Sequence, residues 1–146
     1  MGNRTKVLNR IAMIYLAILA GGILLGCSKI SHDTLVGTYI CHFPEATEEL
    51  QLNVDGTYEQ RVSRDDGKTI PEKHSGKWHL IGSGSFLDDL HVELEDSWIV
   101  HDPWGDFDPN YEKNPLGLQS YPVDEWFGKI YFMLHPDTAW HFDKVK

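Results

Sequence analysis

Hydrophobic and polar residues alternate in short runs from residue 37 onward, without a sustained apolar spacing of helical period. Alternation with a period of two predicts strands that bury one face, and the intervening glycine-bearing turns favour antiparallel hairpins. A lone helix is a weaker alternative for Tyr121–Phe127. We therefore expect an all-β fold, a small antiparallel β-barrel or sandwich of about eight strands. The predicted strands are Gly37–Phe43, Glu48–Asn53, Thr57–Ser63, Gly76–Ile81, Leu90–Glu95, Ser97–His101, Lys129–Leu134 and Ala139–Asp143.

Two hairpins have a predictable register. In the first, Asn53 leads and Gly56 takes a left-handed conformation, which indicates a type I turn with a glycine bulge. The second hairpin centres on Ser85, and this register places apolar residues on one face and polar residues on the other. The predicted pairs are Leu52–Tyr58, Leu50–Gln60 and Glu48–Val62 in the first hairpin, and Trp78–Val92, Leu80–Leu90, His79–His91 and Lys77–Glu93 in the second.

The alternation also predicts which side chains fill the interior. So many of them are aromatic that a packed interior is expected rather than a large empty pocket. Cys41 belongs to this set, and we expect it to behave as a small buried hydrophobic residue. The predicted inward-facing residues are Tyr39, Cys41, Phe43, Leu50, Leu52, Tyr58, Val62, Trp78, Leu80, Leu90, Val92, Leu94, Ile130, Phe132, Leu134, Trp140 and Phe142.

The N-terminal segment has the character of an export signal. Residues 1–10 are basic, and residues 11–25 form an apolar run of 15 residues. A bilayer core takes about 20 helical residues, so the run is typical of a helical signal peptide rather than a membrane span. An uncleaved signal anchor is the alternative. The expected organisation is a cleaved signal peptide at 1–26, a tether at 27–36 and a β-barrel domain at 37–146.

The apolar run ends in Leu24-Leu25-Gly26-Cys27, which resembles the lipobox of bacterial lipoproteins. The resemblance implies cleavage before Cys27 and attachment of a diacylglycerol group to its thiol, with further acylation such as palmitate. Two acyl chains already hold a protein stably at a membrane. Ser28 at the following position implies the outer membrane, with the protein facing the periplasm.

Several turn and core motifs of the domain also match a known family. They are Gly37-Thr38-Tyr39, Leu50-x-Leu52-x-x-Asp55-Gly56-Thr57-Tyr58, Asp66-Gly67-Lys68-Thr69 and Gly76-x-Trp78. Over residues 37–80 the chain resembles the lipocalin-like N-terminal barrel of NlpE-type outer-membrane lipoproteins. The resemblance implies copper tolerance or envelope-stress signalling. The family's copper role rests on a Cys-x-x-Cys pair, and this sequence has Cys41-His42-Phe43-Pro44 at that place.

Charge distinguishes one part of the domain. Residues 27–146 hold 10 basic and 22 acidic residues, a net charge of −12, which argues against nucleic-acid binding. Residues 86–125 alone contribute 11 acidic residues and one basic residue. We expect an acidic aromatic loop at 101–126, acting either as a surface for a cationic protein partner or as a plug of the barrel end. Its candidate partner-binding residues are Trp104, Asp106, Phe107, Asp108 and Tyr111.

Histidine is the other candidate chemistry, because neutral imidazole is the commonest metal ligand. His79 and His91, facing each other across the second hairpin, form half of a candidate metal site. No nucleophile elbow, phosphate-cradling loop or zinc-protease helix is present, so we expect a protein that is not an enzyme and needs no cofactor. The leading hypothesis is a non-catalytic binding lipoprotein of the inhibitor, immunity or adaptor type. The alternatives are copper or zinc handling with stress sensing, and carriage of a small apolar ligand.

Overall fold

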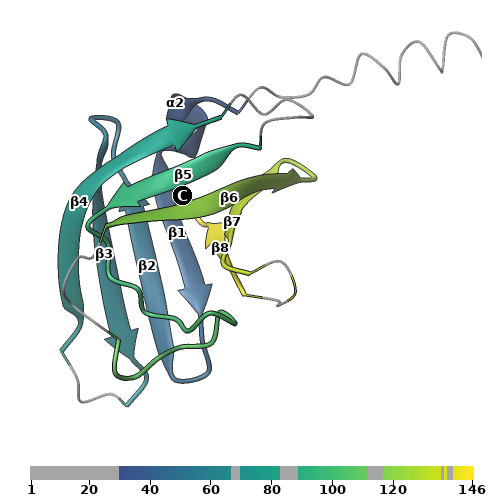
Figure 1. The fold of residues 1–146 in the computed structure, drawn as a ribbon. Helices are drawn as coiled ribbons and strands as arrows, with labels where there is room; N and C mark the ends of the chain where they lie inside the picture. Colours follow the sequence, from purple (N-terminus) through teal and green to yellow (C-terminus); the bar gives the residue numbers. More distant parts are fainter. Residues whose placement is uncertain (1–29, 67–69, 83–88, 112–116, 136, 138–139) are drawn as a thin grey trace, which may run out of the picture.

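Eight antiparallel strands close into a barrel in the computed structural model, which describes residues 30–66, 70–82, 89–111, 117–135, 137 and 140–146. Each strand pairs with the next along the chain, and β8 pairs back with β1 (Figure 1). The barrel alternative is therefore correct, and the predicted signal peptide lies outside the described residues. The strands are β1 (Gly37–His42), β2 (Ala46–Leu52), β3 (Thr57–Arg64), β4 (Glu72–Ile81), β5 (His91–Glu95), β6 (Leu118–Trp126), β7 (Lys129–Met133) and β8 (His141–Lys144).

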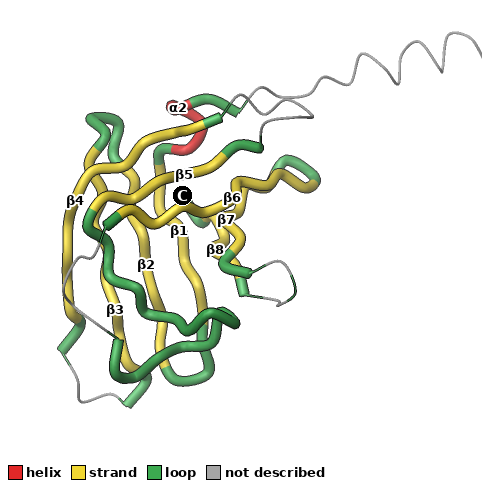
Figure 2. The backbone as a smooth tube through the Cα atoms, in the orientation of Figure 1, coloured by secondary structure: helices red, strands yellow, loops and turns green. Residues whose placement is uncertain are grey.

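Because neighbouring strands run in opposite directions, the connections alternate between the two ends of the barrel. A short helix, α2 (His32–Leu35), precedes β1 and marks what we call the α2 end (Figure 2). The β2–β3, β4–β5 and β6–β7 connections also lie at this end. The opposite end, which we call the loop end, carries the β1–β2, β3–β4, β5–β6 and β7–β8 connections.

Two strands bend from one neighbour to the next and so form the corners of the barrel. Residues 72–77 of β4 pair with β3, and residues 78–81 pair with β5. Residues 118–122 of β6 pair with β5, and residues 123–126 pair with β7. Pro122, which has no N–H to donate, lies where β6 changes partner, a place where a strand tolerates proline.

Two predicted elements are wrong. The stretch Tyr121–Phe127 is not a helix, because its residues to Trp126 belong to β6, so the loop expected at 101–126 ends before that strand. Ser97–His101 is not a strand of the barrel. It belongs to the β5–β6 connection, where His101 makes an isolated bridge to Phe107.

The first hairpin has the predicted register, with Leu52 opposite Tyr58, Leu50 opposite Gln60 and Glu48 opposite Val62. Gly56 has a φ of +79°, and its N–H donates to the carbonyl of Asn53 at 3.2 Å. The second hairpin is displaced by two residues. Its observed pairs are Trp78–Leu94, His79–Glu93, Leu80–Val92 and Ile81–His91. A displacement of two leaves every side chain on the same face, so the hydrophobic pattern alone does not distinguish the two registers.

The barrel interior is packed with most of the predicted inward-facing residues. Cys41 is buried and free, as expected, while Leu80, Ile130, Leu134 and Trp140 are partly buried against the core. Besides Ala46, which begins β2 two residues before its predicted start, five buried apolar residues were missed because they come from the connections, α2 or the unrecognised β6. They are Leu35, Trp98, Val100, Tyr111 and Tyr121.

Within the stretch 27–36, where a tether was expected, residues 32–35 form α2, which packs on the barrel. Leu35 is fully buried under the α2 end, and the hydroxyl of Tyr39 donates to its carbonyl at 2.7 Å. Leu35 therefore adds apolar side-chain burial to the core from the α2 end. Ile30, which precedes α2, is also partly buried against the core.

Candidate functional site

The connection between β5 and β6, residues 96–117, runs across the loop end of the barrel and contains most of the predicted partner-binding surface. We call it the acidic loop; its residues 112–116 lie outside the described part of the chain. The N–H of Asp96 donates to Gly117 O at 3.0 Å, which joins the two ends of the loop. Within it, the N–H of Asp102 donates to Asp106 O at 2.8 Å, and that of Asp108 to Val100 O at 2.9 Å.

Aspartate side chains shape the acidic loop from within. The Oδ1 atom of Asp102 accepts hydrogen bonds from the backbone N–H groups of Trp104 at 2.8 Å and Asp106 at 3.0 Å. The Oδ1 atom of Asp108 accepts one from the N–H of Asn110 at 2.8 Å. Such side-chain turns replace backbone partners, so the carboxylates define the loop conformation as well as its charge.

The inner side of the acidic loop plugs the barrel. Phe107 packs on Phe43 with ring centroids 5.8 Å apart, and Tyr111 lies 6.0 Å from Trp98. Tyr111 is only 7% exposed, and its hydroxyl donates to Glu72 Oε2 at 2.7 Å. Phe107 and Tyr111 were predicted as candidate partner-binding residues, and their inward position instead fits the plug alternative.

The outer side of the loop keeps the remaining candidates available. Trp104 is 67% exposed, and its ring lies 5.9 Å from that of His135. Asp106 is exposed, and its Oδ1 atom accepts a hydrogen bond from Trp140 Nε1 at 2.9 Å. Asp108 is half-buried. Trp104 and Asp106 are therefore exposed, whereas Phe107 and Tyr111 pack against the barrel.

Arg64, at the end of β3, holds the acidic loop from the side. Its Nη2 atom donates to the carbonyl of Pro109 at 2.6 Å, and its guanidinium carbon lies 5.7 Å from the centre of the Phe107 ring. The first contact satisfies a loop carbonyl, and the second is a cation–π interaction. Sequence reasoning missed this residue because its partners lie more than 40 positions away.

A buried polar pair inside the barrel also contacts the loop. Glu48 is 1% exposed, and its Oε1 atom accepts a hydrogen bond from Gln60 Nε2 at 2.6 Å. Gln60 is bonded in turn to the backbone of Trp98. Burial raises the pKa of Glu48 to about 8, although the Gln60 hydrogen bond acts in the opposite direction. The available signal was the predicted register, which already placed these two polar residues on the inward face.

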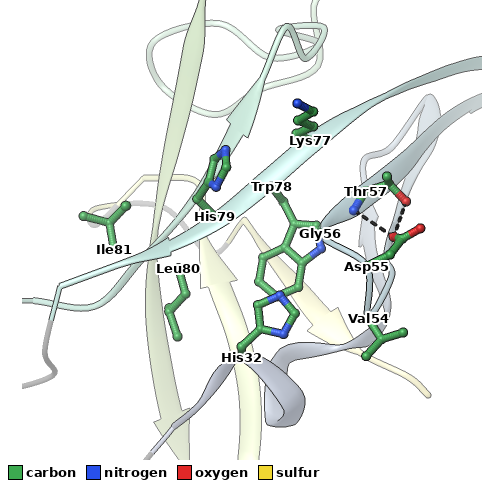
Figure 3. A pocket seen from close by; sticks show the side chains of 10 residues that line it. All are labelled: His32, Val54, Asp55, Gly56, Thr57, Lys77, Trp78, His79, Leu80 and Ile81. Atoms are coloured by element: carbon green, nitrogen blue, oxygen red, sulfur yellow. Dashed lines mark hydrogen bonds between the residues drawn. The ribbon is translucent and has the colours of Figure 1, made fainter.

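A groove of about 750 Å³ lies at the α2 end, between the β2–β3 turn and β4 (Figure 3). The ring of His32, from α2, stacks on Trp78 with centroids 4.2 Å apart and planes 13° apart. A hydrogen bond also holds the Trp78 ring in place, since its Nε1 atom donates to Asn53 O at 2.9 Å. This groove is open to solvent, and Trp78 and Leu80 join its wall to the core.

The two histidines proposed as half of a metal site do not face each other. His79 lies opposite Glu93, and its Nε2 atom is 2.8 Å from Glu95 Oε1. The Nδ1 atom of His91 lies 3.3 Å from the hydroxyl oxygen of Ser120 on β6. Across the described ranges, no group of three or more His, Cys, Asp or Glu side chains is arranged to hold a metal ion.

Cys27, the predicted lipidation site, lies outside the described residues. Among the described residues, none of the helices has the length and apolar character needed to cross a membrane. Comparison of the chain with protein-family models, curated proteins and solved structures finds no match.

Proposed function

We propose that this protein is a bacterial envelope lipoprotein, anchored to the outer membrane through acyl chains on Cys27 and facing the periplasm. In this proposal it is a non-catalytic binding module of the inhibitor, immunity or adaptor type. Its partner is a cationic protein, which the acidic loop recognises. The lipidation proposal is supported by the basic segment, the apolar run and the Leu-Leu-Gly-Cys sequence that ends it.

The observation that carries the binding proposal is the two-sided construction of the acidic loop. Phe107 and Tyr111 pack it against the barrel, while Trp104 and Asp106 are exposed on it. A tryptophan held at the surface of an internally bonded loop loses little conformational freedom on binding, which favours affinity. Tryptophan is also the residue type most enriched among side chains that dominate binding energy.

Charge and position support the same proposal. The acidic loop lies in the part of the chain that carries ten of the twelve net negative charges of residues 27–146, so its field attracts a basic protein and speeds association. The loop end is opposite the α2 end, where the described chain begins. An anchor on Cys27 would therefore leave the acidic loop facing away from the membrane.

The test is site-specific photo-crosslinking in intact cells, followed by measurement with the purified partner. A photoreactive residue at position 104 should capture a basic protein, and one at Val54, exposed at the opposite end, should not. Trp104→Ala should then weaken binding of that protein by about tenfold or more, and Asp106→Asn should reduce the association rate at low salt. Val54→Ala is the matched control. Equal capture at both positions, or an unchanged affinity of Trp104→Ala, would contradict the proposal.

A further inference from the structure

The β6–β7 turn carries two exposed aromatic residues in succession. Trp126 is 66% exposed and Phe127 is 92% exposed, and their rings stack with centroids 5.6 Å apart and planes 18° apart. The turn projects from the barrel wall (Figure 1). We call Trp126 and Phe127 the aromatic tip. The two rings pack on each other rather than on the core, so most of their apolar surface is left in water.

The backbone of the aromatic tip is unfavourable for phenylalanine. Phe127 has a φ of +52° and Gly128 a φ of +75°, so both central residues of this two-residue turn are left-handed. Asn-Gly is the preferred pair at the two central positions of such a turn, because a bulky residue in the left-handed region is strained. Phe127 is 92% exposed and stacks on Trp126, so packing on the core does not offset this strain, and strained backbone of this kind clusters at functional sites.

The position of the aromatic tip points to what it contacts. In this up-and-down topology the end of β6 lies at the same end of the barrel as the start of β1. The described chain begins at that end with Ile30, three residues after Cys27. Three residues reach at most about 11 Å in any conformation. A lipid anchor on Cys27 would therefore hold the α2 end, and the aromatic tip with it, close to the bilayer surface.

We infer that Trp126 and Phe127 insert into the headgroup region of the membrane that carries the anchor, an inference that rests on the proposed lipidation. Tryptophan is enriched at membrane interfaces, and phenylalanine gains from burial at the acyl boundary. Charges of both signs flank the tip, with Glu125 on one side and Lys129 on the other. Insertion thus depends on aromatic burial, and neutral phosphatidylcholine is a sufficient surface. Two contacts, the anchor and the tip, fix the orientation of the barrel.

Quenching of tryptophan fluorescence by brominated lipids tests the insertion. The acylated full chain is reconstituted into phosphatidylcholine vesicles with brominated acyl chains, and flotation measures anchoring separately. The N-terminal segment contains no tryptophan, so quenching reports on the barrel alone. We expect quenching that Trp126→Ser abolishes and Trp104→Ser, an equally exposed tryptophan at the loop end, leaves unchanged.

The outcomes separate the two proposals. A chain that floats with the vesicles but shows equal quenching in both variants overturns the insertion and leaves the anchor standing. A chain that does not float overturns both. Self-association that Trp126→Ser removes, without quenching in the wild type, assigns the tip to a second copy of the chain and also overturns the insertion.

A second variant distinguishes a membrane role from a structural one. Phe127→Asn creates the Asn-Gly turn that this backbone prefers, so the melting temperature should rise by roughly 2–6 °C. The same variant should reduce the quenching of Trp126 by brominated lipids at least twofold, because the tip loses its deepest apolar side chain. A lower melting temperature with unchanged quenching would show that Phe127 serves the fold and would overturn its insertion.

Discussion

The side-chain amide of Gln60 both donates a hydrogen bond to the backbone of Trp98 and accepts one from it. The N–H of Trp98 donates to Gln60 Oε1 at 2.9 Å, and Gln60 Nε2 donates to Trp98 O at 2.9 Å. The amide thus takes the place of a neighbouring strand for a buried residue of the acidic loop. Gln60 Nε2 also donates to Glu48 Oε1 at 2.6 Å, so the interior of the barrel and the loop share one hydrogen-bond network.

Replacement of Gln60 should release the loop from the barrel. Gln60→Leu keeps the volume but leaves the N–H and carbonyl of Trp98 and the Glu48 carboxyl without partners in a buried place. Each unsatisfied buried group costs about 1–3 kcal/mol, so we expect a loss of about 3 kcal/mol in the free energy of unfolding. Urea denaturation measures it. Gln51→Leu on the exposed face of β2 is the control and should change stability by less than about 0.5 kcal/mol.

Glu48 should make stability fall as the pH rises. Burial raises its pKa from an ordinary value of 4.5 to about 8, so the folded state keeps a proton that the unfolded state has lost. The contribution of the protonated carboxyl to the free energy of unfolding is full below pH 4.5. It is lost as the pH rises to 8, at about 1.4 kcal/mol per pH unit. Glu48→Gln cannot titrate. Urea denaturation of both proteins from pH 5.5 to 7.5 should show the difference in unfolding free energy moving in favour of the variant.

Comparing the pH profiles of the wild type and Glu48→Gln separates the titration of Glu48 from that of its neighbours. Burial raises the pKa of Cys41 to about 12 and raises those of the buried tyrosines around Glu48 as well, so none of them titrates in this window. Burial lowers the pKa of His101, which acts in the opposite direction but equally in both proteins. Parallel pH profiles of the wild type and Glu48→Gln would show that the carboxyl is ionised in the fold.

Gly76 lies at the corner where β4 turns from β3 toward β5, and no side chain fits there. An added Cβ would stand 2.5 Å from Glu95 O and 2.7 Å from Cε1 of Tyr58, whose hydroxyl donates to the same carbonyl. Gly76→Ala should therefore force β4 and β5 apart and cost about 1–3 kcal/mol. Ser75→Ala, the adjacent exposed position, is the control in thermal denaturation, and an equal effect of the two would refute this account.

Arg64 should restrain the acidic loop more than it stabilises the fold. Arg64→Ala removes the hydrogen bond to Pro109 and the contact with Phe107, both of which are local to the loop. We expect amide exchange of residues 101–111 to increase about tenfold, with a change of less than about 1 kcal/mol in global stability. Lys73→Ala, an exposed cation on β4, is the control. Unchanged exchange in the loop would show that the barrel contacts of Phe107 and Tyr111 suffice.

The two hairpins show how far pattern reasoning reaches. The register of β2 and β3 was predictable because a four-residue turn with Gly56 leaves one alignment that matches the apolar faces. The register of β4 and β5 was not, because residues 82–90 form a long connection that also accommodates a displacement of two. Tertiary packing selected the pairing of Trp78 with Leu94. β6 was missed for a different reason, since Pro122 interrupts the pattern of a strand.

The candidate site was predictable in composition but not in orientation. The acidic and aromatic character of residues 101–111 is evident from the chain, whereas the side of the loop that each residue occupies is not. The sequence pattern does not distinguish Phe107 from Trp104, and it leaves open whether each faces a partner or plugs the barrel end. Only the position of Phe43, directly after β1, and of Trp98 in the loop decides that Phe107 and Tyr111 turn inward.

By itself the sequence determined the all-β architecture, the alternation that sorts residues between interior and surface, and the excess of negative charge. These are local properties, since strand period and turn chemistry depend on neighbours within a few residues. The tertiary structure decided the closure of the barrel, the register of β4 and β5, the burial of Glu48 and the direction of each side chain in the acidic loop. These depend on contacts between residues up to 110 positions apart, as between Thr34 and Lys144, which packing selects and no local pattern encodes.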